Sequence, residues 1–194
     1  MKLNILILLL LLSNLLIAKD KLDSTTHQYT LKLEIGHQKI GFPLRKPFTN
    51  PYHLYVGIGS ERVWKSKLKH ITYQTLDLGY FKNSSSGSGY FVSSNYGYRY
   101  YVTKSLSLSG EAGVGFINIF RPKAVYELNT DENYEQIRDR GKIHPAINFK
   151  LQMGYKPNKL GVFVEYNMLA EFLYNEDAII YPQTLFSLGI NFNI

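Results

Sequence analysis

Beyond its first twenty residues, most of this chain consists of short segments in which apolar and polar residues alternate one by one. A period of two is typical of β-strands, because successive side chains of a strand point to opposite faces of the sheet. The alternation is clearest in the first segment, residues 29–35, and in the last, residues 186–194. Further segments of this kind begin near residues 54, 71, 90, 106, 147 and 162. The pattern predicts an all-β chain with eight strands.

The third segment departs from strict alternation. Its second half, residues 76–80, alternates regularly, whereas Ile71 and Tyr73 in the first half are out of phase with it. One extra residue in a strand shifts the phase in this way. We therefore expect a β-bulge near Gln74 or Thr75.

The connections between the segments also alternate, in length. They are long, short, medium, short, long, short and medium, at residues 37–52, 65–69, 83–89, 103–104, 121–144, 157–159 and 174–182. In an up-and-down barrel with both termini at one end, the longer connections all lie at the other end. Outer-membrane barrels have this asymmetry, with an even number of strands. No segment predicts a convincing helix, although residues 131–140 have room for one or two helical turns.

The first eighteen residues have a different character. Lys2 precedes an apolar run over residues 5–17 that is interrupted by Ser13 and Asn14, and Ala18 offers a small residue for cleavage. This pattern predicts a signal peptide, residues 1–18, followed by a single barrel domain, residues 19–194. The alternative is an uncleaved anchor, but the run is shorter than the roughly 20 residues of a spanning helix.

Composition excludes several classes of protein. The chain has no cysteine, which excludes a disulfide framework and a thiolate metal site. Removal of Lys2 with the signal peptide lowers the formal net charge from +7 to +6. The basic residues are dispersed and form no block, which argues against nucleic acid as a partner.

The residue types on the two faces indicate which face is outside. The apolar face carries mainly Leu, Ile, Val, Phe and Tyr, whereas the polar face is rich in Gly and Ser. The interior of an eight-stranded barrel is narrow, so small and polar residues suit it and large apolar ones suit the exterior. An apolar exterior requires lipid. The alternative is a soluble, lipocalin-like periplasmic barrel that binds a ligand inside.

Aromatic residues fall near the expected membrane interfaces. We place one girdle at the end of the barrel with the short connections, formed by Tyr29, Trp64, Tyr73, Tyr100 and Tyr155. We place the other at the end with the longer connections, formed by Tyr52, Tyr80, Tyr90, Phe120, Phe172 and Tyr174.

With its signal sequence, strand plan and last strand, the mature chain resembles the small outer-membrane barrels of the OmpA/OmpX type. That resemblance implies an all-β, eight-stranded antiparallel up-and-down transmembrane barrel in the outer membrane of a Gram-negative cell. It also implies that the assembly machinery recognises the C-terminal strand, although Ile194 replaces the usual terminal Phe. Fold alone does not assign a function, since such barrels include anchors, adhesins and lipid-modifying enzymes.

The polar face carries charges of both signs. They are Lys32, Glu34, Glu61, Asp77, Arg99, Glu111, Lys150, Glu165 and Glu171. Buried charges are tolerated when they are paired and hydrogen-bonded. We expect these nine side chains to form a salt-bridged network that closes the interior. The alternative is a narrow path for protons or ions.

An enzymatic alternative depends on the histidines. A lipid A deacylase or acyltransferase needs a His, a hydroxyl and a carboxylate within reach of one another. Known lipid A deacylases carry His and Ser two residues apart on a strand. Here His53 is followed at that spacing by Tyr55, and His144 by Ala146.

Cofactors and metals find no support in the sequence. The acidic residues near position 131 lie among basic ones and lack the spacing of a calcium loop. We predict a non-enzymatic barrel without catalytic, cofactor or metal site. Its expected partners are outer-membrane lipid and an extracellular or membrane protein that contacts residues 37–52 and 121–144.

Overall fold

The computed structural model describes residues 29–41, 52–84, 87–120, 125–128, 134–137, 141–172 and 180–194. Eight strands form a closed barrel: β1 (Tyr29–Ile40), β2 (Leu54–Ser66), β3 (His70–Asn83), β4 (Gly87–Tyr101), β5 (Leu106–Phe120), β8 (Lys142–Tyr155), β9 (Leu160–Phe172) and β10 (Ile180–Asn193). The predicted signal peptide, residues 1–18, and His27 lie outside the described residues.

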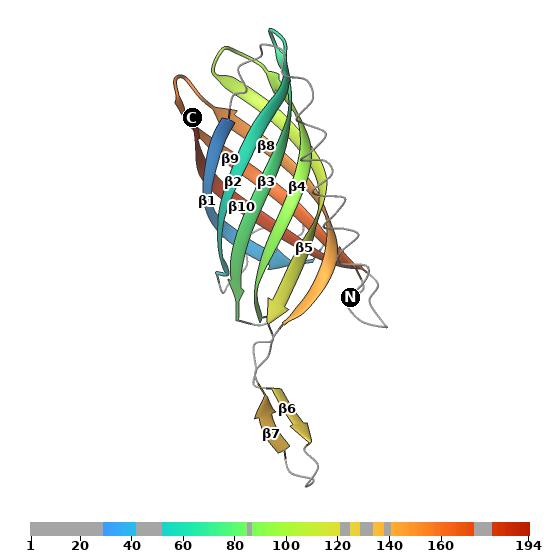
Figure 1. Cartoon of the computed structure of the whole chain (residues 1–194). Helices are drawn as coiled ribbons and strands as arrows, with labels where there is room; N and C mark the ends of the chain where they lie inside the picture. The colour runs from blue at the N-terminus through green and yellow to red at the C-terminus, as the bar shows by residue number, and fades with distance from the viewer. Residues whose placement is uncertain are drawn as a thin grey trace.

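All neighbouring strands of the barrel are antiparallel, and the last strand closes it on the first (Figure 1). β1 pairs with β10 from Thr30 and Asn193 to Ile40 and Gln183, and its other edge pairs with β2. The predicted fold, an eight-stranded antiparallel up-and-down barrel, is therefore confirmed. Closure leaves no strand edge in the barrel unpaired. In the part of the chain that the structure describes, no helix is long and apolar enough to cross a membrane.

The connections divide the barrel into a turn end and a loop end. The turn end holds the start of β1, the end of β10 and the short links at residues 67–69, 102–105 and 156–159. The loop end holds the links at residues 41–53, 84–86, 121–141 and 173–179. The predicted asymmetry is present, but the strands extend further than expected. β1 includes His37, β8 begins at Lys142, and β3 and β4 are separated by only three residues, fewer than the predicted medium loop.

The longest connection contains a hairpin of its own. β6 (Val125–Leu128) pairs with β7 (Tyr134–Ile137) in a two-stranded antiparallel sheet that is separate from the barrel (Figure 1). The prediction of a helical turn within residues 131–140 is wrong where the structure describes it. Tyr, Gln and Ile in the second strand suit a pleated strand, and the antiparallel partner supplies the backbone hydrogen bonds.

The predicted bulge near Gln74 or Thr75 is also wrong. β3 pairs with β4 without interruption from His70 to Asn83, and the register with β2 shifts instead between Val63 and Lys65. Side chains of β3 keep one phase throughout, so Tyr73 points into the barrel with Thr75 and Asp77. A large aromatic residue at an inward position caused the error.

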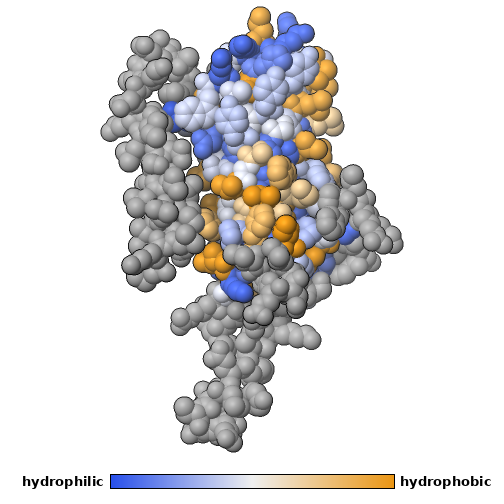
Figure 2. Space-filling view, turned by 90° about the vertical axis from the view of Figure 1, so that its right-hand side faces the viewer, coloured by the Kyte–Doolittle hydropathy of each residue, from blue (hydrophilic) through white to orange (hydrophobic). Residues whose placement is uncertain are grey.

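Large apolar side chains cover the outside of the barrel on every strand. Representative examples, each between about two fifths and two thirds exposed, are Ile35, Ile58, Leu76, Val92, Val114, Leu151, Val162 and Leu188. In Figure 2 hydrophobic residues lie over the middle and the right side of the visible barrel face, and the most hydrophilic residues gather at the turn end. The face predicted to be the exterior is confirmed.

Most of the predicted girdle lies on this outer surface. Tyr29, Trp64, Tyr100, Tyr155, Tyr52, Tyr80 and Tyr90 are exposed, and Phe120 and Phe172 are half-buried. Tyr174 lies outside the described residues. Tyr73 is fully buried in the interior, so its assignment to the girdle is wrong. Tyr96 and Tyr98 extend the turn-end girdle along β4.

Candidate functional site

The barrel interior is the candidate site. All nine charged residues singled out in the sequence lie there with less than a tenth of their surface exposed: Lys32, Glu34, Glu61, Asp77, Arg99, Glu111, Lys150, Glu165 and Glu171. Among them three cations face six carboxylates. Hydroxyl and amide donors must therefore complete the carboxylates' hydrogen bonds.

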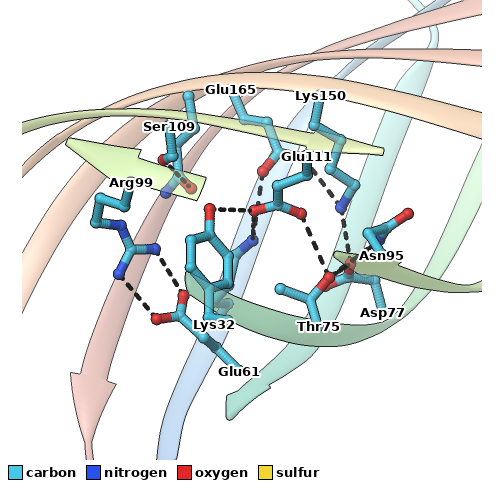
Figure 3. A network of polar contacts seen from close by, with 12 residues as sticks. Lys32, Glu61, Thr75, Asp77, Asn95, Arg99, Ser109, Glu111, Lys150 and Glu165 are labelled. Carbon is cyan, nitrogen blue, oxygen red and sulfur yellow. Dashed lines mark hydrogen bonds and ion pairs between the residues drawn. The ribbon is translucent and has the colours of Figure 1, made fainter. Parts of the chain in front are cut away.

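Two lysines form the centre of the charge cluster (Figure 3). The Lys150 ammonium lies 2.8 Å from Asp77 Oδ2 and 3.3 Å from Glu165 Oε1. The Lys32 ammonium lies 3.4 Å from Glu165 Oε2 and 3.7 Å from Glu111 Oε1. These five side chains come from β1, β3, β5, β8 and β9, so the cluster links strands across the interior.

Neutral donors support this centre. The Thr75 hydroxyl lies 2.8 Å from Asp77 Oδ2 and 3.3 Å from Glu111 Oε2, and the Asn95 amide donates to Asp77 Oδ2 at 2.8 Å. Hydrogen bonds to ionised groups are stronger than those between neutral groups. The arrangement therefore holds the carboxylates at fixed positions.

A second ion pair lies on the turn-end side of the centre. The Arg99 guanidinium donates to both Glu61 oxygens, at 2.8 and 2.6 Å, in a bidentate pair. The guanidinium also lies 4.4 Å from the centre of the Tyr73 ring. The Tyr73 hydroxyl donates to Glu111 at 2.9 Å, so one aromatic side chain connects the Arg99 pair to the lysine cluster.

The remaining two carboxylates are bound by neutral groups or by histidine. Glu34 accepts hydrogen bonds from the Tyr55 and Ser187 hydroxyls, both at 2.7 Å. Glu171 accepts one from the Gln183 amide at 3.1 Å and lies 3.5 Å from His144 Nε2. Seven of the nine predicted residues thus form a connected centre, whereas Glu34 and Glu171 bind other groups, and Glu171 lies nearer the loop end.

An apolar layer fills the interior between the charged centre and the loop end. Seven strands contribute one buried residue each to a single cluster: Tyr55, Phe81, Phe91, Ile117, Ala146, Leu169 and Leu185. On each strand that also carries a charge of the centre, the apolar residue is closer to the loop end. Phe81 follows Asp77 on β3, Ile117 follows Glu111 on β5, and Leu169 follows Glu165 on β9.

Sequence reasoning missed this layer, which it took for a continuation of the polar face. One signal was available in the sequence. Near the loop end consecutive residues of a strand are both apolar, as in Phe116-Ile117 and Met168-Leu169. Two consecutive large apolar residues on a strand place one of them inside the barrel.

Polar groups cover the apolar layer on its loop side. The Asn83 amide donates to Gln38 at 2.7 Å, and the Gln38 amide donates to Gln183 at 3.1 Å. Gln183 in turn donates to Glu171, whose other oxygen faces His144. All five side chains are buried, and they form a chain across β3, β1, β10, β9 and β8.

The three histidines at the loop end, His37, His53 and His144, are buried. His144 and Glu171 form a His–carboxylate pair, but the pair lies inside the barrel. His37 Nδ1 accepts a hydrogen bond from the His53 backbone N–H at 3.0 Å, and the two rings stack at 5.7 Å. That nitrogen of His37 thus binds a backbone group, where a catalytic base would bind an orienting carboxylate. Within the described residues no group of three His, Asp or Glu side chains is placed to hold a metal ion.

Comparison with solved structures identifies the class of this fold. The chain is similar to Ail, the attachment invasion locus protein of Yersinia pestis, at TM-score 0.52 and 10% identity over 88% of this chain and 100% of that one. It is similar to neisserial surface protein A at TM-score 0.59 and 8% identity, over 84% and 96% of the two chains. The N-terminal barrel domain of Pseudomonas aeruginosa OprF matches at TM-score 0.50 and 12% identity, over 87% and 100%.

The protein therefore has the fold of the small eight-stranded outer-membrane barrels, as the sequence resemblance predicted. No protein-family model matches the chain, and no curated protein matches it by sequence.

Proposed function

We propose that this chain is a non-enzymatic integral outer-membrane barrel with a closed interior, which acts through its loops or as a structural partner of another membrane protein. The observation that carries the proposal is the inversion of polarity between the two faces. Large apolar side chains are exposed on all eight barrel strands, whereas nine Asp, Glu, Lys and Arg side chains are buried inside. Such an exterior is stable in hydrocarbon and would form a very large apolar patch in water.

Closure of the interior has two supports. The charged centre is cross-linked by ion pairs, and the apolar layer from seven strands lies beside it. An ion that crossed the layer would lose its hydration without gaining a polar partner there. This favours a closed barrel over a conducting one.

Location is tested by fractionation of cells that express the full chain. We expect a form cleaved after Ala18 that stays in the outer-membrane fraction after a carbonate wash. Closed barrels resist detergent until they are heated, so its electrophoretic mobility should change on boiling. Recovery as a soluble periplasmic protein would reject the membrane proposal and favour the lipocalin-like alternative.

The proposed role of the loops is tested by shortening the longest connection. β8 begins at Lys142, so the deletion should fall within residues 121–140 and spare the barrel pairing. We expect normal insertion and heat-modifiability together with loss of any partner that is cross-linked at the cell surface. Retention of that partner would exclude this loop, and residues 42–51 would be the next segment to replace.

A lipid A hydrolase remains the alternative, and it has a direct test. His53→Ala and His144→Ala should leave the acylation pattern of the host's lipid A unchanged in mass spectra. His144→Ala removes the neighbour of Glu171, so heat-modifiability serves as the folding control for that variant. A change in acylation with a folded barrel would overturn the non-enzymatic proposal.

A further inference from the structure

The three turns at the turn end of the barrel carry a concentration of positive charge. We define the basic collar as Lys65, Lys67, Lys69, Lys104, Lys156 and Lys159. The turn segments 62–70, 101–106 and 155–160 contain no acidic side chain. In the barrel strands and links that the structure describes, all six carboxylate side chains lie inside. The collar is therefore not neutralised by acidic neighbours on the outer surface there.

The collar is held in place by backbone hydrogen bonds between the turns. Tyr101 N–H donates to Lys69 C=O at 2.9 Å, and Lys156 N–H donates to Ser105 C=O at 2.7 Å. Asn193 N–H donates to Lys159 C=O at 3.2 Å, which joins the third turn to the end of β10. The lysines are thus distributed around the barrel on β2–β3, β4–β5 and β8–β9.

Five of the six side chains extend into solvent. Lys156 differs, since it is half-buried and its ammonium donates to Asn193 Oδ1. Burial lowers the pKa of Lys156, because the charged form loses hydration. Lys156 therefore supports the turn, and the other five lysines are available to a ligand.

Aromatic residues next to the collar indicate where it would lie relative to a membrane. Trp64, Tyr100 and Tyr155 are exposed directly beside the three turns, and Tyr98 lies one step further along β4. Trp and Tyr side chains favour the boundary between headgroups and acyl chains. The collar lysines in the turns beyond these aromatic residues would then lie at the height of lipid phosphates. Leu68, fully exposed between Lys67 and Lys69, adds an apolar contact at the tip of the first turn.

We infer that the basic collar binds the headgroups of anionic phospholipids in the leaflet at the turn end. The inference rests on the proposed membrane location. A collar spread over three turns suits several small ligands around the circumference better than one docked protein. Clustered lysines near a membrane surface attract anionic lipid through a short-range, salt-screened field.

The chain contains a reporter for this contact. Trp64 is its only tryptophan, and it lies on the outer surface next to the first turn with the Arg62 guanidinium 4.6 Å from its ring. Brominated acyl chains quench tryptophan fluorescence on contact. The full-length chain can therefore be reconstituted in phosphatidylcholine vesicles that contain brominated phosphatidylglycerol or brominated phosphatidylcholine at equal mole fraction.

We expect brominated phosphatidylglycerol to quench Trp64 about twofold more strongly than brominated phosphatidylcholine at low salt, and the excess to vanish at about 1 M salt. Lys67→Gln with Lys69→Gln should remove at least half of the excess. The matched control, Lys82→Gln with Lys142→Gln, removes two exposed lysines at the loop end and should leave the excess unchanged.

Three results would overturn the inference, and they differ in meaning. Equal quenching by the two lipids would reject a lipid preference and favour an acidic protein as the occupant of the collar. An equal loss in both double variants would assign the preference to net charge alone. Absence of quenching by either lipid would show that the barrel is not embedded, and the membrane proposal itself would fail.

Discussion

The two halves of the barrel interior are filled by side chains of different chemistry. Towards the turn end the space holds lysines, an arginine and carboxylates linked by ion pairs, whereas towards the loop end it holds apolar side chains from seven strands. The charged half gains a unique arrangement from directional contacts, at the cost of desolvating each ion. The apolar half has no such cost, but it depends on close packing.

The difference teaches which half tolerates which change. A charged cluster fails when one partner is removed, because the remaining partner stays buried without compensation. An apolar layer fails when its volume is wrong in either direction. Each kind of failure offers a way to test the boundary between the halves.

The largest effect is expected at Lys150. Lys150→Met removes the cation that Asp77 and Glu165 share, and it leaves both carboxylates inside the barrel. The free energy of unfolding should fall by about 3–5 kcal/mol. Urea unfolding of the reconstituted barrel, followed by Trp64 fluorescence, measures this loss.

The control for this prediction removes the cation together with one of its two carboxylate partners. Lys150→Met combined with Glu165→Gln should recover part of the lost stability, because one carboxylate no longer needs a cation. If the single variant unfolds like the unaltered protein, the charged half does not depend on ion pairing.

The residues of the charged half could be predicted from the sequence, because there the inward-facing positions of the strands are also the charged ones. Asp77, Glu111 and Lys150 each occupy an inward position between outward apolar residues. Which of these charges form ion pairs could not be predicted from the sequence, since that depends on strand register and strand order. The contact of Lys150 with Asp77 joins strands that are not neighbours in the barrel.

The apolar half was hidden for a physical reason. Near the loop end, Ile117 and Leu169 lie inside and their neighbours Phe116 and Met168 lie outside, so hydrophobicity no longer distinguishes the faces. Tyr73 caused a related error, because its ring fills the interior above Gly97, whose added Cβ would lie 2.4 Å from Tyr73 Cζ. Small residues opposite large ones are visible only after strands are paired.

A somewhat smaller loss of stability is expected when a charge is placed on the exterior of the barrel, and a smaller one still when it is placed in the interior. Leu151→Arg or Val164→Arg places a charge on the apolar outer surface and should cost about 2–4 kcal/mol near mid-membrane. Gln152→Arg points inward beside Glu165, its partner in the register of β8 and β9, and should cost less. The same unfolding assay compares the variants. Equal losses at Leu151 and Gln152 would contradict the assignment of the two faces.

The smallest effect tests how tightly the apolar half is filled. A Cβ added to Gly79 would lie 2.4 Å from Phe91 Cε1 and 2.8 Å from Tyr55 Cε2, so Gly79→Ala must displace a ring. The expected loss is about 1–3 kcal/mol. Gly110→Ala on the outer surface is the matched control. The nearest atom to its added Cβ is Leu151 Cδ2 at 3.9 Å, and we expect little change in stability.

A second substitution makes the packing argument specific. Phe91→Leu shortens the side chain that meets the new methyl group, so Gly79→Ala should cost less in the Phe91→Leu background than alone. A double-mutant cycle in the same assay measures this coupling. If Gly79→Ala is as harmless as Gly110→Ala and shows no coupling to Phe91, the ring does not pack against Gly79. The loop-end half would then owe its stability to the polar chain from Asn83 to His144, and the contrast between the two halves of the interior would be lost.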